Sequence, residues 1–253
     1  MLLVRHGRTA ANASGILAGR TPGVDLDETG RAQVAALGER LAPLPVVALV
    51  TSPLERCQQT AAAVLAAGGT EAVPRPAAVV EADLSECDYG DWTGRPLKEL
   101  TAEPLWPVVQ SHPSAAAFPG GESMRAMQAR ALDVVRRVDA AVAAEHGPDA
   151  LWVAVSHGDV IKAVLADALG MHLDAFQRIV VDPASVSVVR YSPLRPFAVR
   201  VNDTGGDVRS LVPAPPAPAE DGAAAASSSD AAVGGGAGGG AGGGGSADPA
   251  ERR

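Results

Sequence analysis

Short apolar runs alternate along this 253-residue chain with longer segments that have helical spacing. Three of the runs are Leu2–Val4, Pro45–Thr51 and Leu151–Val155, and each has the length of a buried strand. Strands that are apolar throughout are typical of parallel sheets, because helices cover both of their faces. The alternation therefore predicts an α/β fold, a three-layer sandwich in which helices flank a mainly parallel sheet.

The segments between the runs carry helix-end signals. Asp27 is a good N-cap for a helix over 28–41, and Ser52 followed by Pro53 predicts the start of a second helix that ends near Ala67. The other expected elements are helices over 123–146 and 160–169, strands over 77–80, 185–191 and 197–201, and an irregular polar stretch over 81–121.

The composition changes sharply after residue 202. Residues 203–253 hold 13 of the 28 glycines, and most of the remainder is Ala, Ser and Pro. Such a segment buries too little apolar surface to offset the entropy that ordering it would cost. We therefore expect one domain over 1–202, followed by a disordered tail over 203–253.

The charge balance and the cysteines exclude several classes of protein. The net charge of −8, from 21 basic and 29 acidic side chains, argues against a nucleic-acid-binding surface. No apolar run approaches the roughly 20 residues that a membrane-spanning helix needs, and no signal-peptide pattern is present. Cys57 and Cys87 form neither a disulfide framework nor a zinc-binding spacing. We expect a cytoplasmic protein without metal or cofactor, whose partner is neither nucleic acid nor membrane; its oligomeric state stays open.

Basic residues and histidines follow three of the expected strands. Arg5-His6-Gly7 follows the first run, Arg56 lies shortly after the second, and Ser156-His157-Gly158 follows the third. Because the carboxyl ends of parallel strands line one crevice of a sheet, two histidines and two arginines should meet there. Positive groups beside helix N-termini form an anion site, and phosphate is the natural ligand.

These motifs, in this order, resemble those of the histidine phosphatase superfamily, also called the phosphoglycerate mutase-like family. The similarity extends to residues 84–94 (LSECDYGDWTG) and to Gly120-Gly121-Glu122-Ser123 with Arg130. The resemblance covers about residues 2–200 and implies a phosphoglycerate mutase-like fold. The chain is most similar to actinobacterial members described as phosphomutases.

The resemblance implies a role for each matching residue. His6, Glu86 and His157 form the implied catalytic set: His6 forms a phosphohistidine, and Glu86 acts as general acid and then general base. Neutral imidazole is a good nucleophile, provided that its second ring nitrogen donates to a backbone carbonyl. Glu81 is a weaker candidate for the acid, because it precedes the L-x-E-x-x-x-G pattern. The residues implied to bind phosphate are Arg5, Asn12, Arg56, His157 and Gly158, and those implied to bind the rest of the substrate are Arg20 and Tyr89.

Other functions are open. Residues 25–29 match the DxDxT motif of magnesium-dependent haloacid dehalogenase-type phosphatases, but they follow a loop and are better interpreted as a helix entry. A phosphomutase is the main alternative, although Arg95 and Lys98 are the only basic residues between 94 and 121 that could hold a second acidic group. A phosphate-binding pseudoenzyme is less well supported, because the whole catalytic set is present. We expect a metal-independent phosphomonoester hydrolase that acts on a small phosphorylated metabolite.

Overall fold

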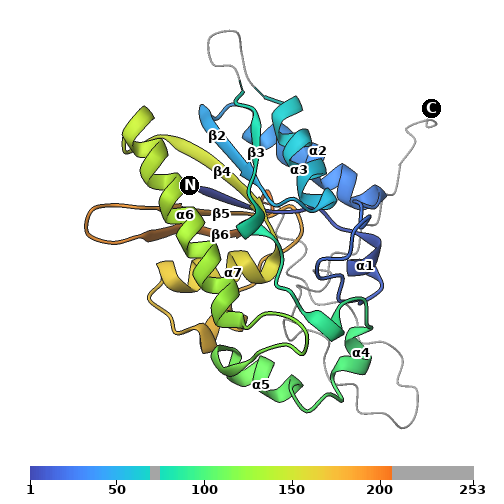
Figure 1. The fold of residues 1–253 in the computed structure, drawn as a ribbon. Helices are drawn as coiled ribbons and strands as arrows, with labels where there is room; N and C mark the ends of the chain where they lie inside the picture. Colours follow the sequence, from blue (N-terminus) through green and yellow to red (C-terminus); the bar gives the residue numbers. More distant parts are fainter. Residues whose placement is uncertain (69–74, 207–253) are drawn as a thin grey trace, which may run out of the picture.

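The computed structural model describes residues 1–68 and 75–206, so most of the tail expected to be disordered lies outside the described residues. Within them a six-stranded sheet has the order β3-β2-β4-β1-β5-β6 (Figure 1). The strands are β1 (Leu2–Arg5), β2 (Val46–Thr51), β3 (Ala78–Val80), β4 (Leu151–Ser156), β5 (Val186–Arg190) and β6 (Phe197–Asp203). The first four run parallel to one another, and β5 is antiparallel to both of its neighbours, β1 and β6. The prediction of an α/β sandwich with a mainly parallel sheet is confirmed, and β6 runs one residue past the boundary expected at 202.

Helices cover both faces of the sheet (Figure 1). On one face lie α2 (Glu28–Leu41) and α3 (Glu55–Ala66), and on the other α6 (Met124–His146) and α7 (Gly158–Ala168). The shorter helices are α1 (Ala10–Ala13), α4 (Leu97–Leu100), α5 (Trp106–Ser111) and the 3-10 turns η1 (Ala82–Leu84), η2 (Gly90–Trp92), η3 (Pro113–Ala115) and η4 (Leu173–Arg178). The stretch over 81–121 is therefore less irregular than expected. No described helix is both long and apolar enough to cross a bilayer.

One of the two predicted helix caps is wrong. Asp27 caps α2 as expected, because its Oδ1 accepts a 2.7 Å hydrogen bond from the Gly30 amide. The second helix, α3, begins at Glu55 with Leu54 as its N-cap, and Ser52 is not its cap. The Ser52 hydroxyl lies 2.7 Å from Nε2 of His157 and accepts from the Leu54 amide at 3.3 Å, so it caps none of the amides of the first helical turn.

Two glycines let α2 lie against the loop that follows β1. A Cβ on Gly7 would lie 2.7 Å from both the Gly30 carbonyl oxygen and Cγ1 of Val34, and a Cβ on Gly30 would collide with the carbonyl of Arg8. Contacts of this closeness exclude a side chain at either position. The glycine after His6 is therefore a packing requirement, and it fixes the loop that carries this histidine.

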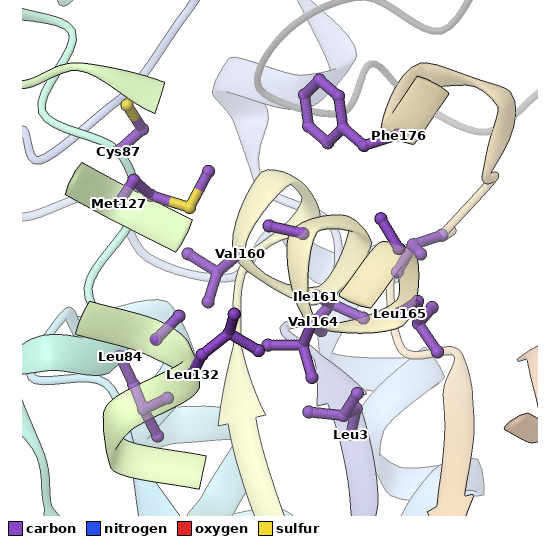
Figure 2. Packing of buried hydrophobic residues seen from close by; sticks show 14 of the residues in the cluster. Leu3, Leu84, Cys87, Met127, Leu132, Val160, Ile161, Val164, Leu165 and Phe176 are labelled. Carbon is purple, nitrogen blue, oxygen red and sulfur yellow. The ribbon is translucent and has the colours of Figure 1, made fainter. Parts of the chain in front are cut away.

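The core lies in two layers, one on each side of the sheet. Helix α7 is buried almost all round, and Figure 2 shows its apolar side chains between Leu3 of β1 and the residues of α6. Leu165 is fully buried in this layer, whereas Leu194 is 85% exposed. A helix that is buried on every side is typical of the centre of a layered domain.

Replacing Leu165 with alanine should lower the free energy of unfolding by about 2–5 kcal/mol, because it removes buried methyl groups and leaves a cavity. Leu194→Ala is the matched control and should change it by less than about 0.5 kcal/mol. Urea denaturation followed by circular dichroism measures both. Similar losses for the two variants would contradict this description of the core.

Candidate active site

The strand order brings the two motif histidines together. In the parallel pair β1 and β4, Arg5 lies in register with Ser156. The next residues along the chain are His6 and His157, and their ring centroids lie 5.2 Å apart. The two rings therefore meet at the carboxyl edge of the sheet, as the motif order predicts.

Two fixed partners determine the proton position on His6. Its Nδ1 lies 2.7 Å from the Gly7 carbonyl oxygen, and Arg56 Nε donates to its Nε2 at 3.3 Å. Because a carbonyl only accepts and a guanidinium only donates, the proton is on Nδ1 and the lone pair is on Nε2. Burial, followed by the charges of Arg56 and Arg5, holds the pKa of His6 well below its usual value. The ring is therefore neutral, with Nε2 available as a nucleophile.

Arg56 connects the two histidines. It is 2% exposed, and its Nη2 donates to the Gly19 carbonyl at 2.8 Å and lies 3.3 Å from Nδ1 of His157. Its Nη1 is buried and has no hydrogen-bond partner among the described residues. A buried donor without a partner costs about 1–3 kcal/mol. An anion beside the histidine pair would supply the missing acceptor.

His157 is held in place from the side opposite Arg56. Because Arg56 donates to Nδ1, the proton of the neutral ring lies on Nε2 and points to the Ser52 hydroxyl at 2.7 Å. Burial and then the Arg56 charge hold the pKa of His157 well below its usual value. Helix α7 begins at the next residue, Gly158, so the positive end of its dipole lies beside this ring.

Glu86 is a buried carboxyl group that interacts with the charges of Arg56 and Arg5. It is 3% exposed, and its Oε1 accepts a hydrogen bond from the Cys87 amide at 2.9 Å. Burial, and next the negative charge of Asp159, raises the pKa of Glu86 to about 7, against the pull of the two arginines. The other candidate, Glu81, forms a 2.6 Å ion pair with Arg137. Of the two, Glu86 has the environment that a general acid and base needs at neutral pH.

A cluster of charged side chains holds the backbone of Glu86. Arg20 Nε and Arg130 Nη2 both donate to the Glu86 carbonyl, at 2.8 and 3.1 Å. The Glu122 carboxylate binds both arginines, at 2.9 and 2.6 Å. Arg20 thus helps to position Glu86, and its expected contact with substrate stays a prediction.

Two further expected ligand residues have partners within the protein. Asn12 Oδ1 accepts from the amide and hydroxyl of Thr9, at 3.1 and 2.9 Å, which closes a capping box at the start of α1. Tyr89 is fully buried, and its hydroxyl donates to Asp159 at 2.7 Å. The roles assigned to Asn12 in binding phosphate and to Tyr89 in binding substrate stay predictions.

Sequence reasoning gave no role to several residues that shape the site. Thr60 accepts from the Gly7 amide at 3.2 Å and donates to the Arg56 carbonyl at 2.7 Å, so it ties the loop of His6 to α3. Thr60 lies one helical turn after Arg56, which is the signal that could have found it. Glu122 and Arg130 stand in a motif that carried the resemblance, but their contacts with the Glu86 segment depend on tertiary packing.

The rival magnesium motif does not lie at a strand end. Asp27 of that motif caps α2 and forms a 2.8 Å ion pair with Arg8, so the interpretation as a helix entry is confirmed. In the described part of the chain no three metal-ligating side chains lie together. Cys57 and Cys87 are both buried free thiols, and burial raises the pKa of Cys57 to about 12.

The sequence model of the histidine phosphatase superfamily (branch 1) matches residues 1–204 of the chain. The chain belongs to this superfamily. It is 31% identical over 180 residues to a glucosyl-3-phosphoglycerate phosphatase of Mycolicibacterium vanbaalenii, covering 69% of this chain and 76% of that protein. The native structure of a mycobacterial glucosyl-3-phosphoglycerate phosphatase matches with a TM-score of 0.70 and 25% identity, over 80% of this chain and 98% of that one. The family and fold inferred from the motifs are confirmed.

Another relative is longer than the region it shares with this chain. A bifunctional protein of Mycobacterium tuberculosis is 33% identical over 213 residues, which cover 81% of this chain but 54% of that protein. The chain thus spans about half the length of this relative.

Arg130→Ala should lower both stability and turnover, because it removes hydrogen bonds to the carbonyls of the Glu86 segment and leaves Glu122 with one arginine fewer. We expect the free energy of unfolding to fall by about 2–4 kcal/mol, as for lost charge-assisted hydrogen bonds. We expect kcat on alkyl phosphates to fall more than KM rises. Denaturation and steady-state kinetics measure the two effects. Arg136→Ala is the control, because Arg136 lies on the same helix and pairs with Asp167 at the surface; equal effects of the two variants would refute the positioning role.

Proposed function

We propose that this chain hydrolyses phosphomonoesters of small metabolites through a phosphohistidine on His6, without a metal ion. The observation that carries the proposal is the donor set around His6. A neutral imidazole, whose unprotonated Nε2 accepts a hydrogen bond from Arg56 Nε, lies beside this buried arginine, and the arginine's Nη1 has no acceptor in the described part of the chain. Buried positive groups stabilise the charge of a transferring phosphoryl group, which is the main task of a phosphoryl-transfer site.

In the first step Nε2 of His6 attacks phosphorus and the bond from phosphorus to the ester oxygen breaks. The Gly7 carbonyl accepts from Nδ1–H and so supports the positive charge that develops on the ring. Glu86 gives its proton to the departing oxygen, which leaves as an alcohol. Arg56 and Arg5 are proposed to hold the phosphoryl oxygens, and His157 to join them with the N–H that points to Ser52 in the free site.

In the second step a water molecule attacks the phosphohistidine. Glu86, now a carboxylate, takes a proton from this water, and the bond from phosphorus to Nε2 breaks to release inorganic phosphate. A pKa of about 7 suits both tasks, because the carboxyl group gives and regains a proton with little free-energy difference at neutral pH. The step restores neutral His6 and protonated Glu86.

A small phosphorylated metabolite is the proposed substrate, and hydrolysis is preferred over phosphoryl shuttling. Relatives are named as phosphatases of glucosyl-3-phosphoglycerate and of phosphoserine, and both compounds are small phosphorylated metabolites. Arg95, which could hold a second acidic group, instead forms a 2.6 Å ion pair with Glu103. The net charge of −8 supports a small-molecule partner over nucleic acid, and the two buried free thiols fit a cytoplasmic location.

Replacing Glu86 with glutamine tests the proposal through the leaving group. Turnover of an alkyl phosphate should fall by roughly 10²- to 10⁴-fold, because glutamine cannot protonate a departing alkoxide. With p-nitrophenyl phosphate the first step needs little protonation, so a burst of nitrophenol followed by slow turnover should appear. Stopped-flow and steady-state assays in the presence of EDTA measure both effects.

Glu81→Gln is the control and should leave both substrates unaffected, because Glu81 is bound to Arg137. Equal loss on both substrates without a burst in Glu86→Gln would refute its role. Wild-type activity that requires added magnesium would refute the metal-free mechanism.

A further inference from the structure

Helix α7 buries an ion pair that the proposed reaction does not use. Asp159 is fully buried and Lys162 is 1% exposed, and Lys162 Nζ lies 3.9 Å from Oδ1 of Asp159. The ammonium group also donates to Gln177 at 3.1 Å and lies 5.8 Å from the ring of Phe176. Burying two charges costs several kcal/mol, and apolar side chains often stabilise such positions better. The pair therefore calls for an explanation other than stability.

Asp159 is linked to the segment that carries Glu86. It stands in the first turn of α7, two residues after His157. Its Oδ2 accepts a 2.7 Å hydrogen bond from the hydroxyl of Tyr89, which lies three residues after Glu86. Both Tyr89 and Asp159 are completely buried, so water does not screen the charge. The aspartate thus connects the start of α7 to the segment that carries Glu86.

The charges around Glu86 pose a problem for its proposed role. The arginines that bind phosphate favour the ionised carboxylate, which has no proton to give. The negative charge of Asp159 opposes them, and the positive charge of Lys162 moderates that of Asp159. The charged and titratable groups of the described residues that interact electrostatically with Glu86 are Arg5 from β1, Arg56 and Cys57 from α3, Arg130 from α6, Asp159 and Lys162 from α7, and Cys87 and Tyr89 from the segment of Glu86 itself. Arg20 donates to the Glu86 carbonyl.

We propose that Asp159 is a positioning residue for acid catalysis: its charge, fixed by Tyr89 and moderated by Lys162, keeps Glu86 protonated beside the phosphate-binding arginines. This inference rests on the proposed hydrolase, in which Glu86 is the proton donor. Asp159 acts through Glu86 and gives no proton to the substrate. Lys162 sets how strongly it acts.

Charge changes at the two positions should shift the pH profile in opposite directions. For an alkyl phosphate, kcat/KM falls as the pH rises and Glu86 loses its proton. Asp159→Asn keeps an acceptor for Tyr89 but removes the charge, so the midpoint of this fall should move about one pH unit lower. Lys162→Met leaves the charge of Asp159 unopposed, so the midpoint should move higher by a similar amount. The ionisation of the substrate is common to all variants and does not affect the comparison.

Three controls separate this effect from a general loss of structure. Asp167→Asn removes a charge from the same helix at the surface, where Asp167 pairs with Arg136, and should not shift the profile. With p-nitrophenyl phosphate, which needs no proton from Glu86, kcat/KM of neither site variant should show the shift. Melting temperatures report on folding. If Asp159→Asn does not fold, the upward shift in Lys162→Met carries the test alone.

The outcomes also distinguish this inference from the proposed function. Opposite shifts on the alkyl phosphate support it. Unchanged midpoints, or shifts in one common direction, overturn it, provided that the wild type is a phosphatase and that Glu86→Gln shows the alkyl-selective loss expected when the proton donor is removed. An alkyl-selective loss at every pH in Asp159→Asn would make Asp159 itself the donor and would also overturn it. Absence of phosphatase activity in the wild type would refute the proposed function, and this inference with it.

Discussion

The guanidinium of Arg56 lies between two imidazole rings, and this contact determines what the site can do. Burial, together with this cation at 3.3 Å from His6 Nε2 and from His157 Nδ1, lowers the pKa of both rings and keeps them neutral. The same cation has a buried Nη1 without an acceptor in the described residues, which suits the anion that we propose binds beside His6. In the proposed mechanism this one side chain serves both the nucleophile and the phosphate, and both functions depend on its exclusion from water.

The surrounding elements hold Arg56 and the two histidines together and away from water. Parallel strands deliver His6 and His157 to one edge, and the close approach of α2 at Gly7 and Gly30 fixes the first of these loops. Thr60 anchors the same loop to the helix that carries Arg56. Arg20 and Arg130 hold the backbone of Glu86. The site is therefore built from contacts between elements that are distant in sequence.

Much of this could be predicted from the sequence. Apolar runs of strand length predict the sheet. Strands that are buried on both faces are apolar throughout, and this pattern can be recognised in the sequence alone. The motif histidines and arginines could be placed at one site because they follow parallel strands, whose carboxyl ends meet at one edge of the sheet. The Ser52 cap was wrong because the helix begins later, at Glu55, and the Ser52 hydroxyl contacts the Leu54 amide and His157 instead. Helices α4 and α5 were missed because helices of 4 and 6 residues depend on packing more than on propensity. The pairing of Asp159 with Tyr89 was equally invisible, because it joins residues 70 positions apart.

The most direct measurement is the location of the phosphoryl group during turnover. Glu86→Gln slows hydrolysis of the phosphoenzyme, so labelled p-nitrophenyl phosphate should load it, and quenching in alkali preserves a phosphohistidine. Peptide mapping should place a base-stable, acid-labile label on His6, and the double variant with His6→Asn should carry none. A label on another residue, or one that persists in the double variant, would contradict the account.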